Sequence, residues 1–162
     1  MKRKLFSIIL IFLLSSPSWS ETVTIDDLVK KEDLFYKKFS IFSPLGFLFP
    51  FTGIVESYYE NGDLWKKVNF KDGKKDGLYE SYWRSGQLMR KGRFSKNKEW
   101  GTWEIYHKNG QVRTREFKIN GKSDGFVETY DSNGSLVSIE TDGEVIDLQF
   151  RSYENLDFKI ED

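Results

Sequence analysis

Short runs of alternating apolar and polar residues, separated by turn residues, fill the middle of the chain. The runs are about six to eight residues long and rich in Tyr, Trp, Phe, Val and Ile, which predicts β-strands. One kind of turn signal occurs at Asn61-Gly62, Ser85-Gly86, Asn109-Gly110 and Asn133-Gly134. A second kind occurs around Asp72-Gly73, Lys96-Asn97 and Asn120-Gly121. Because Asn and Gly both tolerate φ > 0, the first signal predicts tight turns, and the chain is expected to form successive β-hairpins.

The same pattern recurs every 24 residues. The series that are identical in all copies are Gly53, Gly77, Gly101 and Gly125; Glu56, Glu80, Glu104 and Glu128; Tyr58, Tyr82, Tyr106 and Tyr130; and Gly62, Gly86, Gly110 and Gly134. This period predicts four repeats, at 53–76, 77–100, 101–124 and 125–148, with the pattern weakening near 145. The expected fold class is all-β. It is an elongated antiparallel meander of tandem β-hairpin repeats that forms an open repeat array, with a further hairpin around Asp142-Gly143.

Strand alternation divides each repeat into two faces. The better candidate for a core face holds Val55, Tyr79, Trp103, Val127, Tyr59, Trp83 and His107. The other face carries a Tyr–Glu stripe. A two-residue turn would place Glu56, Glu80 and Glu104 opposite Lys67, Lys91 and Arg115, and a three-residue loop would place them opposite Lys66, Arg90 and Thr114. Most of these pairings join opposite charges and stabilise a sheet by about 0.2–1 kcal/mol each, so a structural role is favoured over a row of catalytic carboxylates.

Both ends of the chain differ from the repeats. Residues 1–20 are expected to be a secretory signal peptide, because three basic residues precede an apolar run of 10 residues and a small-residue site that ends at Ser20. An uncleaved membrane anchor is the alternative. Residues 21–52 are expected to be a lead-in or cap that includes the apolar loop 41–51, and residues 149–162 an acidic tail.

Composition narrows the possible chemistry. The chain has no cysteine, which excludes disulfides, thiolate metal sites and a thiol nucleophile. Residues 53–122 hold 16 basic and 9 acidic residues, whereas residues 123–162 hold 2 basic and 11 acidic residues. This asymmetry favours a polyanion-binding face beside an acidic tail, or else serves only to keep a repeat protein soluble.

The pattern Gly-x-x-Glu-x-Tyr-x-x-Asn-Gly-x-Leu, closed by Asp-Gly-Lys-x-x-Gly, resembles the MORN-repeat-variant family. Residues 101–110 are the copy that is most similar to it, and the resemblance covers about residues 28–145. Residues 34–39 and 50–53 also look like the lead-in of the bacterial, antitoxin-like branch of that family. The resemblance implies stacked β-hairpins and a role in protein or membrane association. It implies no catalytic residues, and a signal peptide argues against the antitoxin of a cytoplasmic toxin, although an immunity-type role in the envelope stays open.

Sequence motifs for catalysis are absent from the chain. His107 is the single histidine, and one histidine cannot supply a clustered metal site. No G-x-S-x-G, P-loop or G-x-G-x-x-G motif occurs, so the glycines are expected to serve turns. We therefore expect a protein that is not an enzyme and that has no catalytic residue, cofactor or metal site. Export argues against nucleic acid as a partner.

Two candidate binding surfaces remain. The predicted interaction surface consists of Tyr58, Tyr82, Tyr106, Lys67, Lys91, Arg93, Arg113 and Arg115. Strand parity places its five cations on one face, and a two-residue turn would place the three tyrosines beside them. The predicted apolar docking loop consists of Phe42, Phe47, Leu48 and Phe49, with a cap over the open end of the sheet as the alternative role. The expected partner is another protein in the cell envelope or outside the cell. An anionic membrane surface or a glycan is the alternative.

Overall fold

The structure, a computed structural model, describes residues 21–37, 50–141 and 143–148. The N-terminal elements are β1 (Glu21–Thr24), the 3-10 helix η1 (Ile25–Asp27), β2 (Leu28–Lys31) and β3 (Leu34–Lys37). The strands that follow are β4 (Gly53–Tyr58), β5 (Leu64–Lys71), β6 (Lys74–Tyr82), β7 (Leu88–Ser95), β8 (Lys98–Tyr106), β9 (Val112–Ile119), β10 (Lys122–Tyr130), β11 (Leu136–Thr141) and β12 (Glu144–Asp147).

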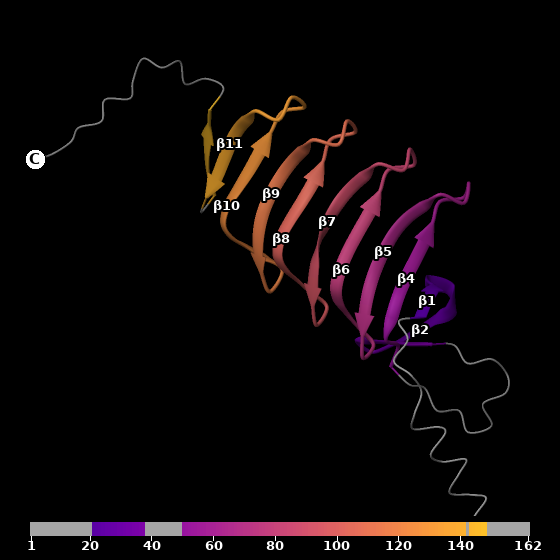
Figure 1. Cartoon of the computed structure of the whole chain (residues 1–162). Helices are drawn as coiled ribbons and strands as arrows, with labels where there is room; N and C mark the ends of the chain where they lie inside the picture. Colours follow the sequence, from indigo (N-terminus) through magenta and orange to yellow (C-terminus); the bar gives the residue numbers. More distant parts are fainter. Residues whose placement is uncertain (1–20, 38–49, 142, 149–162) are drawn as a thin grey trace, which may run out of the picture.

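One long sheet has the strand order β1-β4-β5-β6-β7-β8-β9-β10-β11-β12, and β2 pairs with β3 in a small second sheet. Figure 1 shows the strands of the long sheet side by side in a single row, from the indigo N-terminal end to the yellow C-terminal end. Neighbours from β4 to β12 are antiparallel, so the predicted all-β meander of hairpins is confirmed, including the hairpin β11–β12. Strand β1 was not predicted, and it pairs with β4 in parallel.

The Asn-Gly turn is a three-residue loop. The Tyr59 amide donates to the Asp63 carbonyl (2.8 Å), and the Gly62 amide donates to the Tyr59 carbonyl (2.9 Å). Gly62 has a φ of 89°, whereas Asn61 keeps a negative φ. A three-residue loop requires the left-handed region only at its last residue, and glycine supplies it there.

The second kind of turn is the two-residue one. Asp72 and Gly73 have φ values of 50° and 76°, and Lys96 and Asn97 have values of 49° and 72°. Two consecutive residues with φ > 0 define the type I′ turn, whose twist matches that of the flanking strands. Asn97 thus takes the place of a turn glycine, as its position in the repeat predicts.

A β-bulge follows each three-residue loop and resets the pairing. The register shifts between Ser57 and Tyr58, which leaves Trp65 as an extra residue on β5. Beyond the shift, Glu56 lies opposite Lys67. The loop therefore has three residues, as one alternative predicted. The glutamate nevertheless faces Lys67, the partner predicted for a two-residue turn, because the bulge shifts the register by one residue.

The apolar core lies at the N-terminal end of the predicted core face. The Phe70 ring packs against Phe35 and Phe51, with ring centroids 5.2 and 6.1 Å apart. These rings come from three separate segments, so the first repeat is closed by residues that precede it in the chain. The buried cluster consists of Val23, Leu28, Phe51, Val55, Val68 and Phe70.

An aromatic cluster continues this face into the second and third repeats. The Trp103 side chain is only 1% exposed. It lies so close to the backbone of Gly92 that a Cβ there would be 2.2 Å from the indole. Its ring centroid is 5.4 Å from that of Tyr79 and 5.3 Å from that of Phe94, and the Arg90 guanidinium lies 4.2 Å from it. The predicted core face is confirmed for Val55 and Trp103, whereas Tyr79 stays partly exposed.

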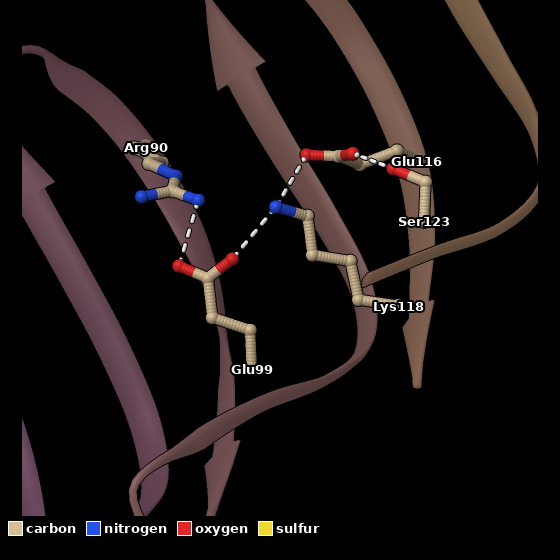
Figure 2. Close-up of polar contacts among 5 residues, drawn as sticks. All are labelled: Arg90, Glu99, Glu116, Lys118 and Ser123. Atoms are coloured by element: carbon tan, nitrogen blue, oxygen red, sulfur yellow. Dashed lines mark hydrogen bonds and ion pairs between the residues drawn. The ribbon is translucent and has the colours of Figure 1, made fainter. Parts of the chain in front are cut away.

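Next to the aromatic cluster, ion pairs connect strands β7, β8 and β9 on the same face. Figure 2 shows these contacts. Glu99 contacts Arg90 (2.9 Å) and Lys118 (2.7 Å), and Lys118 also contacts Glu116 (3.1 Å). The Ser123 hydroxyl donates to Glu116 (2.7 Å). Among the described residues, no hydrophobic side chain after Trp103 is buried.

Candidate interaction surface

The strand register brings one charged side chain from each of the strands β4 to β10 into a single row. Glu56 lies opposite Lys67, and Lys67 in turn lies opposite Glu80. The same pairing continues across each following strand. We call this set the charge row, and it consists of Glu56, Lys67, Glu80, Lys91, Glu104, Arg115 and Glu128. Negative and positive residues alternate along it, so each cation has a carboxylate-bearing residue on either side.

A tyrosine accompanies each glutamate of the charge row. In every repeat the tyrosine hydroxyl donates to the glutamate two residues earlier on the same strand. The O–O distances are 2.6 Å for Tyr58 and Glu56, 2.9 Å for Tyr82 and Glu80, 2.6 Å for Tyr106 and Glu104, and 2.8 Å for Tyr130 and Glu128. The predicted surface tyrosines Tyr58, Tyr82 and Tyr106 thus share one environment, and Tyr130 extends them into the fourth repeat.

The pairing changes the acidity of its members. Burial and the hydrogen bond to Glu80 raise the pKa of Tyr82 to about 12. Burial and the hydrogen bond to Glu104 likewise raise the pKa of Tyr106 to about 12. The pKa of Glu104 is lowered, because the Tyr106 hydroxyl and the Arg115 guanidinium stabilise its charged form against partial burial. At neutral pH the tyrosines are therefore fixed hydrogen-bond donors.

Arg115 connects the third repeat to the fourth. Its Nε donates to Glu104 (3.0 Å), and its NH1 lies 3.6 Å from Glu128 and 3.4 Å from the Tyr130 hydroxyl. The guanidinium also lies 5.8 Å from the centroid of the Tyr130 ring. Lys67 has a longer contact, 3.4 Å, with Glu56. Arg115 therefore has more contacts with the glutamates of the charge row than Lys67 has.

Two predicted surface residues lie outside the charge row. Arg93 is opposite Leu78 on β6 and Trp100 on β8. Arg113 is the extra residue at the register shift on β9. Counting in twos from Arg115 fails across such a shift, so the parity that grouped Arg113 with Arg115 does not hold. No signal in the sequence marks this bulge, since Arg113 corresponds to Trp65 in the first repeat.

His107 links neighbouring repeats. Its Nε2 lies 2.9 Å from the Tyr130 carbonyl oxygen. Two repeats earlier the Tyr59 hydroxyl donates to the Tyr82 carbonyl (2.7 Å). At the position between them, the buried indole nitrogen of Trp83 has no hydrogen-bond partner among the described residues. His107 therefore occupies a position whose side chain spans to the next repeat. Within the described ranges, no group of three His, Cys, Asp or Glu side chains is arranged to hold a metal ion.

The predicted docking loop lies outside the described residues, and so do Phe42, Phe47, Leu48 and Phe49. The predicted signal peptide at 1–20 and the predicted acidic tail at 149–162 lie outside them as well. In the part of the chain that the structure describes, no helix is both long and apolar enough to span a membrane.

The family model described as MORN repeat variant matches three segments of the chain, at residues 51–72, 75–97 and 101–118. The matched segments correspond to the hairpins β4–β5, β6–β7 and β8–β9. This match supports the resemblance drawn from the repeat motif over three repeats. No curated protein matches the chain.

Proposed function

We propose that the chain is a non-enzymatic binding module that associates with another protein through the face that bears the tyrosines and the charge row. The match to the MORN repeat variant model over three repeats suggests a repeat-based binding module. The observation that carries the proposal is the repetition of one Tyr–Glu pair on four consecutive hairpins. Side chains that are already held by hydrogen bonds lose little rotamer entropy when a partner binds.

The cations that the charge row leaves free indicate the chemistry of the partner. Lys67 and Arg115 are paired with glutamates. Arg93 and Arg113 are the predicted surface residues that stand outside the row. Arg93 lies on the face of the row, because the register from Glu80 to Leu78 is unbroken. An acidic partner surface would pair with Arg93, and binding would be weak and sensitive to salt.

A charge reversal tests this surface. Arg93→Glu should weaken capture of the partner from envelope extract, as identified by mass spectrometry, with the melting temperature nearly unchanged. The matched control is Lys96→Glu, which makes the same change of charge on a turn. Full capture by the arginine variant at low salt would exclude the surface.

We also propose that the protein is exported and acts in the cell envelope, since residues 1–20 have the pattern of a signal peptide. N-terminal sequencing of the exported protein should then begin at Glu21. A protein that starts at Met1 and stays in the inner membrane would contradict export. An immunity-like role is a narrower form of the proposal. It requires a partner that is toxic to cells lacking this chain and harmless to cells that produce it.

A membrane-surface or glycan-binding role is the alternative. The observation that favours it is the exposed Trp65 ring, which has the Lys66 ammonium 4.1 Å from its centroid. An aromatic ring beside a cation suits the interface of an anionic bilayer. Co-sedimentation with phosphatidylserine liposomes and with insoluble glycans should be negligible if the protein-binding proposal is right. Binding that Trp65→Ala removes would favour the alternative.

A further inference from the structure

A shallow pocket of about 280 Å³ lies at the junction of the third and fourth repeats. Phe117 and Phe126 line it, and their side chains are 43% and 62% exposed. The polar part of its lining comes from Asp124, Glu128, Arg115, Thr102 and Glu116. Two exposed aromatic rings therefore lie beside carboxylates in one hollow of the sheet surface.

Comparison with the preceding junction shows what is different here. The positions 24 residues before Phe117 and Asp124 hold Arg93 and Trp100, which lie opposite each other on β7 and β8. There the chain itself places a cation beside an aromatic residue. At the later junction an aromatic residue and a carboxylate occupy these positions, and the arginine has been lost.

The carboxylate of Asp124 does not accept the backbone hydrogen bond that the equivalent aspartate of the first repeat accepts. Asp76, which occupies the same position in the first repeat, accepts a hydrogen bond from the backbone amide of Lys96 (3.2 Å). Asp124 is exposed and makes no hydrogen bond or ion pair with the described residues. The guanidinium of Arg115 is committed to Glu104 and Glu128. The pocket therefore keeps one unpaired negative charge beside two aromatic rings.

The charge of the whole C-terminal repeat has the same sign. Residues 123–148 contain 7 acidic residues and no lysine or arginine. Such a region attracts cations and repels anions over distances of about one Debye length, roughly 8–10 Å at moderate salt. It therefore differs from the surroundings of Arg93, which is proposed to meet an acidic surface.

We propose that this pocket accepts the cationic side chain of an arginine or lysine from a partner polypeptide. The alkyl stem would lie between Phe117 and Phe126, and the charged head would reach Asp124. Cation–π attraction and a carboxylate both favour a guanidinium or ammonium group at such a site. The pocket borders the charge row at Arg115 and Glu128. The proposal rests on Asp124, Phe117 and Phe126, none of which is among the cations that the proposed function assigns to an acidic partner, so the two proposals can fail separately.

The test uses two peptides that differ in charge alone. The full chain, labelled with ¹⁵N, is titrated with N-acetyl-Gly-Ser-Arg-Ser-Gly-amide and with the same peptide carrying citrulline, which has nearly the shape of arginine without its charge. The arginine peptide should shift the amide signals of Gly125 and Phe126. The citrulline peptide should bind about three- to tenfold more weakly, the range that a surface cation–π contact and one carboxylate supply.

Variants locate the effect. Asp124→Asn should lower the affinity for the arginine peptide to that for the citrulline peptide, and Phe126→Ala should weaken both peptides. Phe126 is exposed, so this variant is expected to fold normally, which circular dichroism checks. Glu60→Gln, on the exposed loop of the first repeat, is the matched control and should change nothing. Equal binding of the two peptides, shifts away from the pocket, or undiminished binding by Asp124→Asn would overturn the proposal.

Discussion

The first and third repeats place opposite chemistry at the same positions of the sheet. Val68 and Phe70 on β5 are buried in the apolar core. Their equivalents two repeats later on β9 are Glu116 and Lys118, which form an ion pair of 3.1 Å. Both pairs nevertheless occupy a regular antiparallel hairpin.

The difference follows from what lies over each strand. Phe35 on β3 and Phe51 pack on Phe70, so an apolar residue there is removed from water. The side chains around Lys118 remain partly exposed, and a charged network tolerates water where an apolar cluster would not. The glycine, glutamate and tyrosine that recur in every repeat specify the hairpin. The residues that vary between repeats are apolar where other side chains pack on the sheet and charged where the sheet is open to water.

Exchanging the residues at these equivalent positions should have the largest effect. Phe70→Lys places an unpaired charge in the core and should lower the free energy of unfolding by more than about 4 kcal/mol. Lys118→Phe loses its contacts with Glu99 and Glu116, at a cost of about 1–3 kcal/mol. Urea denaturation measures both. If Phe70→Lys fails to fold, Phe70→Ala should still show a loss of about 3–5 kcal/mol. Equal losses for the two exchanges would contradict the comparison.

The boundary between the two regions lies at Gly92, and a methyl group there should be the next most damaging change. Gly92→Ala would bring Cβ to 2.2 Å from the Trp103 indole, at a typical cost of about 1–3 kcal/mol for overpacking. Gly110→Ala is the control, because its φ of 88° costs about 1 kcal/mol while the described residues leave the space open. Thermal melts compare the two. Combining Gly92→Ala with Trp103→Leu should cost less than the sum of the single changes, and strict additivity would contradict the close contact.

The polar region should respond more weakly and only locally. Arg115→Glu places three carboxylates in succession, at positions 104, 115 and 128, and should destabilise the C-terminal strands by about 1 kcal/mol at low salt. Hydrogen exchange should then be faster in β10 and β11 than in β4 and β5. Adding Glu128→Arg should restore protection from exchange, because the glutamate at position 115 then lies opposite an arginine at position 128. Uniform acceleration along the sheet would show that the repeats do not respond separately.

Replacing the tyrosines of the Tyr–Glu pairs should have the smallest effect on stability at neutral pH. Their contribution can be measured in alkaline solution. Tyr82 and Tyr106 have pKa values of about 12 in the folded chain, against about 10 in an unfolded one. A raised pKa means that folding favours the neutral hydroxyl. Its contribution to stability is complete below pH ~10 and is lost as the pH rises from ~10 through ~12. Tyrosinate absorbance should show this late titration, and Tyr82→Phe with Tyr106→Phe should remove it.

The sequence predicted the hairpins and the Tyr–Glu stripe because equal residues at equal offsets must meet equal surroundings in a repeat array. It could not predict the bulges. The extra residue in each repeat is Trp65, Met89, Arg113 or Val137. Three of these are apolar and one is a cation, so no single residue type marks the position. Because of the bulge, a three-residue loop gives the strand pairing that was expected of a two-residue turn, as in the pairing of Glu56 with Lys67. The sequence alone does not reveal this shift.

The sequence also shows where the apolar core ends, if the residues at one position of the core face are compared between repeats. The positions of Val68 and Phe70 become Glu116 and Lys118 within two periods. Only the structure shows that Gly92, which breaks no pattern in the repeat, makes room for Trp103. The packing of one side chain over a neighbouring strand depends on rotamers that a linear pattern does not contain.

The pairing of β1 with β4 has a consequence for how the chain is assembled during synthesis. Glu21 meets Gly53 across an intervening stretch of chain, whereas the other pairings of the long sheet join strands adjacent in sequence. Once β4 has been made and joined to β1, each later hairpin can complete itself on an edge that already exists. Growth then proceeds in the direction of translation. A further 24-residue unit added after β11 would extend the array without disturbing any contact formed before it.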